Sequence, residues 1–217
     1  MRIETKRLVL RPWREDDAAA LFRYASDPEV GPAAGWAPHK SEEDSLHILR
    51  TVLMDDHTWA ITIAPSDEPV GSIGIPVGKN EKENGEHEIG YWIGKPFWGN
   101  GYVPEAVRAL LSLYFAFGAE RIWCAHAEGN DKSRRVIEKC GFRYRFSAPW
   151  QSSLGDVRNS LYYAIEAEEF DEVTLLGRDG AEEITVDELG RLSGRFPYEF
   201  VCDITPRVHR VYVCDPD

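Results

Sequence analysis

The stretch PFWGNGYVP at residues 96–104 separates a strand-like segment from a helix-like one. The helix-like segment has the apolar spacing of an amphipathic helix, with Pro104 in its first turn and Gly118 just past its end. A helix start exposes backbone N–H groups and the positive end of the helix dipole, and Gly99 and Gly101 let a ligand approach the backbone closely. The stretch therefore predicts an anion-binding loop, with a simple tight turn as the alternative.

Two common phosphate-binding loops do not fit this stretch. No Lys-Ser or Lys-Thr pair follows the glycines, as it would in a nucleoside triphosphate loop. Pro104 stands where a dinucleotide-binding fingerprint has its third glycine. The ligand has to be inferred from the surrounding motifs.

The segment before the loop, residues 87–93, alternates as a strand does. Its two faces consist of Ile89, Tyr91 and Ile93 on one side and Glu88, Gly90 and Trp92 on the other. The only acidic side chain of the strand thus lies on the face opposite its isoleucines.

The rest of the pattern predicts a mixed α/β fold. We expect strands at residues 7–11, 59–63, 70–75, 121–127, 142–146 and 160–165, helices at about 16–27, 41–54 and 131–140, and a polar loop at 79–86. In the C-terminal part, a capping box predicts a short helix at 185–192, and two apolar runs predict a hairpin at 200–213.

Composition narrows the function classes. With 217 residues, 43% hydrophobic residues and a net charge of −12, the chain predicts one folded domain plus an appendage. Its acidity argues against nucleic-acid binding, and residues 169–217 alone carry −7. No apolar run suggests a membrane span or a signal peptide, and the four cysteines lack metal-ligand spacing. We expect a cytoplasmic protein without a metal.

Four segments in order carry a family resemblance. They are TKRLVLRPW at residues 5–13, EIGYWI at 88–93, PFWGNGYVPEA at 96–106 and NDKSRRVIEKCGF at 130–142. Together they resemble the GNAT superfamily of acyl-CoA N-acyltransferases, and the first segment is similar to its RimJ/RimL-like branch. The resemblance covers about residues 3–168.

The resemblance implies a mixed, mostly antiparallel sheet, split in a V and flanked by helices, with acetyl-CoA as co-substrate in the split. Carried onto this sequence, it implies a cofactor-binding set of Trp92, Ile93, Gly99, Asn100, Gly101, Tyr102, Val103, Asn130, Ser133 and Arg135. The basic residues of the segment 132–145 fit the phosphates of CoA, or else simply form a solvated helix face.

Amine acetylation needs a base, a polarised thioester carbonyl and a proton for the leaving thiolate. Glu88 is the candidate base, with a merely orienting role as the alternative. A backbone N–H near Ile93 or Gly94 would polarise the carbonyl. Many superfamily members have a tyrosine where this chain has Ile137, so Ser133 or water is assigned to the thiol.

These inferences predict an acetyl-CoA-dependent N-acetyltransferase at residues 1–168, followed by an acidic extension at 169–217. The acceptor is a protein N-terminus or a small cationic amine, and the alternative is a non-catalytic acyl-CoA-binding or interaction module on the same fold. The extension is too apolar to lie free in solvent. It packs on the domain, covers the acceptor cleft or takes part in a homodimer.

Overall fold

A computed structural model describes residues 1–75, 87–170, 177–179 and 182–184. The first sheet contains, in spatial order, β1 (Ile3–Glu4), β2 (Leu8–Pro12), β3 (Thr58–Ile63), β4 (Pro69–Gly74) and β6 (Gly90–Ile93). All of its neighbouring strands are antiparallel. The second sheet has the order β5 (His87–Glu88), β7 (Arg121–Ala127), β9 (Val157–Glu166) and β8 (Arg143–Gln151), with only β5 and β7 parallel.

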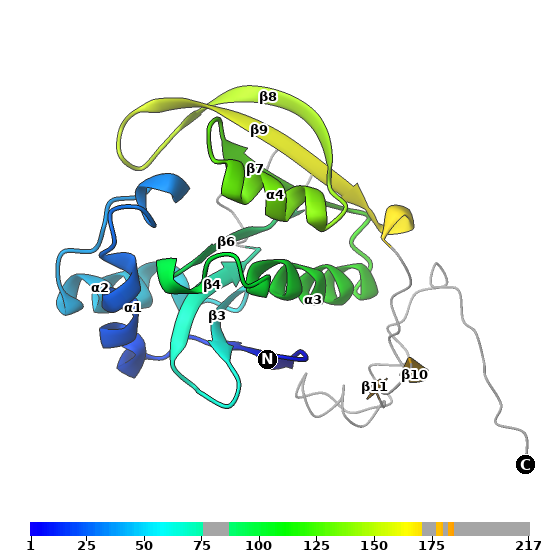
Figure 1. Cartoon of the computed structure of the whole chain (residues 1–217), viewed down its shortest axis with the longest axis horizontal. Helices are drawn as coiled ribbons and strands as arrows, with labels where there is room; N and C mark the ends of the chain where they lie inside the picture. Colours follow the sequence, from blue (N-terminus) through cyan, green and yellow to red (C-terminus); the bar gives the residue numbers. More distant parts are fainter. Residues whose placement is uncertain (76–86, 171–176, 180–181, 185–217) are drawn as a thin grey trace, which may run out of the picture.

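Four α-helices flank these sheets (Figure 1). They are α1 (Ala18–Ala25), α2 (Glu42–Ile48), α3 (Tyr102–Ala116) and α4 (Asp131–Lys139). The main core joins α3 to both sheets through buried side chains such as Ile61, Leu110 and Ile122. A second core lies under α1 and α2, around Trp13, Leu21 and Leu49. The mixed, mostly antiparallel fold predicted from the sequence is confirmed.

The segment 87–93 belongs to both sheets in turn. Its first residues pair with β7, and the Ile89 N–H donates to the Trp123 carbonyl at 2.8 Å. From Gly90 onward it pairs with β4 instead. The two sheets therefore part just after Ile89, which is the V-shaped split that the sequence predicted.

The β8–β9 hairpin is longer than predicted. Its strands run from Arg143 to Gln151 and from Val157 to Glu166, whereas we expected them at 142–146 and 160–165. The longer β8 includes Pro149, which an edge strand tolerates because its missing N–H costs no ladder hydrogen bond. The predicted loop 79–86, the helix at 185–192 and the hairpin at 200–213 lie outside the described residues.

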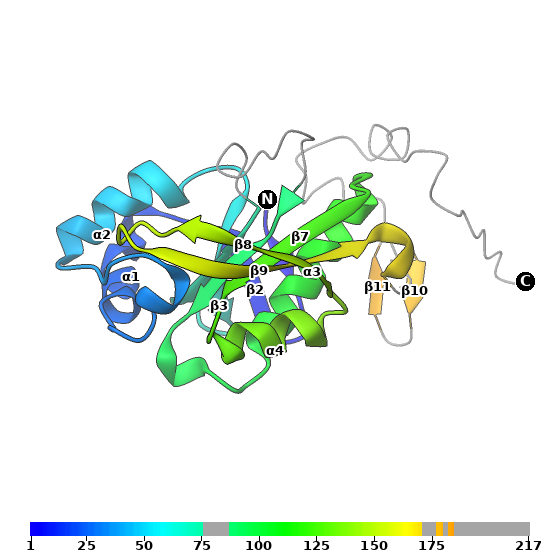
Figure 2. The same ribbon diagram turned by 90° about the horizontal axis from the view of Figure 1, so that it is seen from above.

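The long hairpin reaches the N-terminal helices (Figures 1 and 2). Near its tip, the Ser153 N–H donates to the Gly35 carbonyl at 3.0 Å, and the Arg158 guanidinium donates to the Pro32 carbonyl at 2.6 Å. The hairpin thus ties the second sheet to the loop between α1 and α2.

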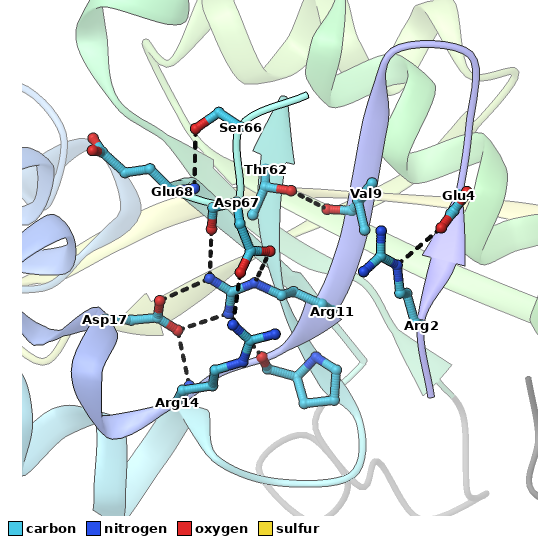
Figure 3. Close-up of polar contacts among 11 residues, drawn as sticks. Arg2, Glu4, Val9, Arg11, Arg14, Asp17, Thr62, Ser66, Asp67 and Glu68 are labelled. Carbon is cyan, nitrogen blue, oxygen red and sulfur yellow. Dashed lines mark hydrogen bonds and ion pairs between the residues drawn. The ribbon is translucent and has the colours of Figure 1, made fainter. Parts of the chain in front are cut away.

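A buried arginine holds the N-terminal half together (Figure 3). Arg11, only 2% exposed, donates two hydrogen bonds to the Asp17 carboxylate, both at 2.8 Å. It also donates to the Asp67 carboxylate at 2.8 Å and to the Asp67 carbonyl at 2.6 Å. The hydrogen bonds to Asp17 raise the pKa of Arg11 despite its burial. The network joins β2 to the start of α1 and to the β3–β4 turn, so it fixes the frame that carries β6.

Candidate active site

The glycine loop follows β6 and leads into α3. Gly99 has a φ of 79° and Gly101 a φ of 78°, a left-handed conformation that side chains disfavour. Helix α3 begins at Tyr102, so the N–H groups of Tyr102 and Val103 have no carbonyl of their own helix to bind. The predicted loop is present with its amides at a helix N-terminus, where an anion is favoured.

The loop is braced by the N-terminal segment. Arg7 donates to the Asn100 carbonyl at 3.0 Å, and its guanidinium lies 4.7 Å from the centre of the Tyr102 ring. The same guanidinium bonds to Glu105 at 2.7 Å, and the Thr5 hydroxyl also donates to Glu105 at 2.7 Å. Burial raises the pKa of Glu105, but these hydrogen bonds outweigh it and lower the pKa overall. Glu105 is therefore ionised. Its carboxylate holds Arg7 and Thr5 against the start of α3, and its negative charge also interacts favourably with the helix dipole.

Trp98 connects the loop to both β6 and α4. Its indole N–H donates to the Ile93 carbonyl at 2.9 Å. The ammonium of Lys132 lies 3.6 Å from the centre of the Trp98 ring, a cation–π contact. The indole therefore bridges the end of β6 and the first turn of α4, the two elements on either side of the split.

The backbone of β6 has one edge toward β4 and one toward the split. The Gly94 N–H donates to the Val70 carbonyl at 2.8 Å, and Trp92 lies opposite Ser72 in the same ladder. Because antiparallel residues alternate in the direction of their hydrogen bonds, Tyr91 and Ile93 direct their backbone groups to the split. The expectation that Gly94 polarises the thioester is wrong, since its N–H is already bonded to β4.

The start of α4 lies across the split from β6. The Asn130 carboxamide oxygen accepts from the Ser133 N–H at 3.1 Å, and its nitrogen donates to the Ala33 carbonyl at 3.1 Å. The side chain predicted to hold the CoA arm thus caps α4 and ties it to the α1–α2 loop. Arg135 is exposed on the same helix.

Half of the basic residues at 132–145 are ion-paired. Arg134 bonds to Asp131 and Glu138, Arg143 to Glu169, and Arg145 to Glu166. Within residues 1–75 and 87–170, Lys132, Arg135 and Lys139 have no ion pair with a carboxylate. Of these, Lys132 and Arg135 lie nearer the start of α4 and are the better candidates for contacts with phosphate.

Tyr91 lies on the α4 side of the split. Its hydroxyl is 3.0 Å from the Ser133 hydroxyl and 3.3 Å from the Ser133 carbonyl oxygen. Burial raises the pKa of Tyr91 well above its ordinary range; the nearby thiols of Cys124 and Cys140 raise it further, while the bond to Ser133 offsets part of this. A neutral phenol therefore stands against the serine that the sequence assigned to the thiol.

Glu88 lies on the opposite face, toward the outer side of the second sheet. It pairs with Trp123 in the β5–β7 register. Burial raises the pKa of Tyr162, and the Glu88 carboxylate raises it further, so the two side chains are electrostatic neighbours. The carboxylate thus lies beside a wall of aromatic rings formed by Trp123 and Tyr162.

Open space lies next to this carboxylate. Gly90, two residues along the same face, is exposed, and no described atom lies within 4 Å of the place where a Cβ would stand. Trp92 is the next residue on this face, and its ring centre is 5.8 Å from that of Trp36. A small group can therefore stand over Gly90, between the carboxylate and the indole.

The other described parts of the chain give weaker candidates for a functional site. A hollow of about 390 Å³ beside the Arg11 network is lined by Thr62, the turn at 64–67 and, at its rim, Arg2 and Glu4, which pair with each other at 2.9 Å. Over residues 1–75 and 87–170, no group of three or more His, Cys, Asp or Glu side chains is arranged to hold a metal. None of the described helices is long and apolar enough to cross a membrane.

The chain matches a known family of proteins over most of its described length. Residues 7–143, more than half of the chain, match the family described as the acetyltransferase (GNAT) domain. The chain therefore belongs to the GNAT acetyltransferases, as the sequence motifs indicated.

Individual relatives agree with this family. The N-acetyltransferase YoaA of Bacillus subtilis, itself uncharacterized, is 31% identical over 147 residues, which are 65% of this chain and 82% of YoaA. A GNAT acetyltransferase of Bacillus anthracis has a crystal structure with a TM-score of 0.68 and 26% identity, covering 78% of this chain and all of that one. The microcin C7 self-immunity acetyltransferase MccE, solved with acetyl-CoA and AMP, shares the fold with a TM-score of 0.63 at 19% identity, over 75% of this chain and 93% of that one.

A shorter match concerns the branch within the family. A stretch of 63 residues is 41% identical to YdaF of Bacillus subtilis, whose name describes a ribosomal N-acetyltransferase. It covers 29% of this chain and 34% of YdaF.

The C-terminal part has a different relative. Residues 156–212 match the C-terminal domain of alanine racemase. An alanine racemase of Symbiobacterium thermophilum is 55% identical over 42 residues, which are 19% of this chain and 11% of the racemase. Since the matched region starts at 156, it overlaps β9, which is a central strand of the second sheet here.

Sequence reasoning missed three features of the site. Tyr91 was placed on the correct strand face, but its partner Ser133 lies 42 residues away. The open space over Gly90 had no sequence signal beyond the absent side chain. The brace by Arg7 could have been suspected, because the segment 5–13 was one of the recognised motifs.

Proposed function

We propose that this protein is an N-acetyltransferase that moves the acetyl group of acetyl-CoA to a primary amine in a ternary complex. The observation that carries the proposal is the split strand 87–93. The glycine loop follows its end, its edge away from β4 has no paired strand among the described residues from Gly90 onward, and Glu88 lies on the same face as the exposed Gly90.

The donor lies along the edge of β6. Its pyrophosphate binds the amides from Gly99 to Val103, with Lys132 and Arg135 near the phosphates. From there the pantetheine arm runs back toward Ile89, where the sheets meet. The free edge of β6 favours Ile93 over Trp92 as its backbone partner, and Asn130 and Ser133 border the arm from α4.

The acceptor amine stands over Gly90 on the other face. Glu88 takes a proton from the ammonium form, directly or through one water, and the free amine attacks the acetyl carbon. The Ile93 N–H stabilises the oxyanion that forms on the carbonyl. A carboxylate flanked by indole rings favours a cationic acceptor, since both attract an ammonium group.

Two acceptor types fit this site: a protein N-terminus and a small cationic amine. The short match to YdaF and the opening segment TKRLVLRPW favour the first and a RimJ/RimL-like branch. The exposed Gly90 gives room for either. A non-catalytic acyl-CoA-binding module on the same fold is the second candidate, favoured by Ile137 at the position where many family members have a tyrosine.

We further propose that residues 1–168 form the acetyltransferase domain and that 169–217 are an extension. Strand β9 belongs to the second sheet and is followed by the short helix Ala167–Glu169. Phe170, directly after this helix, packs on Phe115 with ring centres 5.4 Å apart. A cytoplasmic location and a homodimer are further expectations. The buried free thiols of Cys124 and Cys140 suit a reducing compartment.

The test is turnover of acetyl-CoA against a panel of amines, comprising peptides with free N-termini, polyamines and amino acid derivatives. Release of the CoA thiol, together with a mass gain of one acetyl group on the amine, is the expected result. Tight acetyl-CoA binding without turnover on any amine would contradict the enzyme proposal and favour the binding module.

A further inference from the structure

The leaving thiolate of CoA needs a proton, and the described site contains a donor that the sequence did not suggest. Ile137, at the position where many relatives have a tyrosine, is 1% exposed and packs in the main core. It has no proton to give. Besides Ser133 and water, a donor can come from another element that borders the split.

Tyr91 meets the geometric requirements for this donor. It lies on β6, between Gly90 and Trp92, where the backbone edge faces the split. Because side chains alternate, its phenol lies on the α4 face while Glu88 lies on the acceptor face. A thioester held at this point of the strand has the base on one side and the phenol on the other.

Ser133 gives the phenol a partner for proton exchange. The two hydroxyl oxygens are 3.0 Å apart, and Ser133 is fixed in the first turn of α4 by the Asn130 cap. When the Ser133 hydroxyl donates to the Tyr91 oxygen, the phenol proton, which otherwise bonds to the Ser133 carbonyl at 3.3 Å, can turn to another acceptor. Burial raises the pKa of Tyr91 and so keeps the phenol protonated until the thiolate forms.

We propose that Tyr91 is the proton donor to the departing CoA sulfur, and that Ser133 restores its proton. This role rests on the proposed N-acetyltransferase function. As the amine nitrogen bonds to the acetyl carbon, the carbon–sulfur bond breaks and its electron pair goes to sulfur. The Tyr91 O–H proton moves to that sulfur, the Ser133 hydroxyl reprotonates the phenolate, and water replaces the serine proton. The ammonium form loses two protons through Glu88 to solvent, one before the attack and one as the amide forms. Since water returns one proton through Ser133 and Tyr91, the net products are an amide, a free thiol and one proton.

The first test compares three variants at saturating amine. Tyr91→Phe removes one oxygen and should lower kcat by on the order of 10-fold to 10²-fold, with acetyl-CoA affinity unchanged. Ser133→Ala should cost less, because water can reprotonate the phenolate. Tyr163→Phe is the matched control, since it removes a hydroxyl that contacts His126 at 3.3 Å and is 5% exposed in the same core. It should leave kcat unchanged.

The second test separates chemistry from structure. Fluorinated tyrosines at position 91 grade the acidity of the phenol with little change in shape, so kcat should vary systematically with that acidity. A role limited to holding α4 would give no such trend, and Tyr91→Phe and Ser133→Ala would then have equal effects. Either result, or full activity of Tyr91→Phe, would overturn the proposal while leaving the N-acetyltransferase function intact. A wild-type protein inactive on every amine would instead overturn the underlying function, and this role with it.

Discussion

The proposed donor side and acceptor side of strand 87–93 offer different kinds of chemical groups to a ligand. On the proposed donor side, the candidate binding groups are mostly backbone amides, held by Gly99, Gly101 and the start of α3. On the acceptor side they are side chains, with Glu88 and Trp92 flanking the open space over Gly90.

This difference explains why sequence motifs predict the acyl donor but do not predict the acceptor. A pyrophosphate-binding loop needs particular backbone angles, which leave glycines at fixed spacing in the sequence. A pocket of side chains tolerates many residue types and changes with its ligand. The donor is therefore predicted from motifs, whereas the acceptor has to be found by experiment.

The largest effect is expected on the donor side. Gly101→Glu places a carboxylate and a strained left-handed residue in the loop, so acetyl-CoA binding measured by calorimetry should be lost. Gly118→Glu is the matched control, because Gly118 also has a positive φ, of 91°, but lies at the far end of α3. It carries the same strain and charge and should still bind. Binding by both variants would refute the loop as the cofactor site.

The next effect tests the acceptor side alone. Glu88→Gln keeps the shape of the side chain but removes the base, so kcat/KM should fall by on the order of 10² or more. Acetyl-CoA affinity should stay the same, since the donor lies on the other face. Glu128→Gln, an exposed acid after β7, serves as the control. Unchanged kinetics in Glu88→Gln would leave Glu88 with an orienting role at most.

A smaller, graded effect is expected at Gly90. Its φ is not positive, so Ala and Val introduce bulk without backbone strain. Gly90→Ala should raise the KM of the amine, and Gly90→Val should raise it further and lower kcat/KM by about 10-fold to 10²-fold, because a displaced amine reacts poorly. The affinity for acetyl-CoA should be equal in all three proteins. If both variants retain wild-type KM values across the amine panel, the acceptor does not stand over Gly90.

Local sequence motifs predicted the strand, loop and helix of the proposed donor side. The strand, the glycine loop and α3 are consecutive in the chain, so their pattern is visible in one short window. Contacts between distant elements were not visible. The bond of Tyr91 to Ser133, the brace of Arg7 on Glu105 and the burial of Arg11 against Asp17 and Asp67 all depend on how the elements pack.

The smallest effect is expected from the C-terminal extension. The match to an alanine racemase covers only 42 residues, fewer than most independently folding domains have. The second sheet ends with β9 at Glu166, and Phe170 just after it packs on Phe115 of α3. A protein ending at residue 170 should therefore keep kcat/KM within about twofold of the full chain, as expected for changes away from core and site. Light scattering of both proteins reports the oligomeric state at the same time, since a loss of subunits after truncation would assign the extension to an interface. Loss of acetyl transfer with retained folding, checked by circular dichroism, would instead show that the extension covers the acceptor side, and would make that side a composite of two unrelated sequence families.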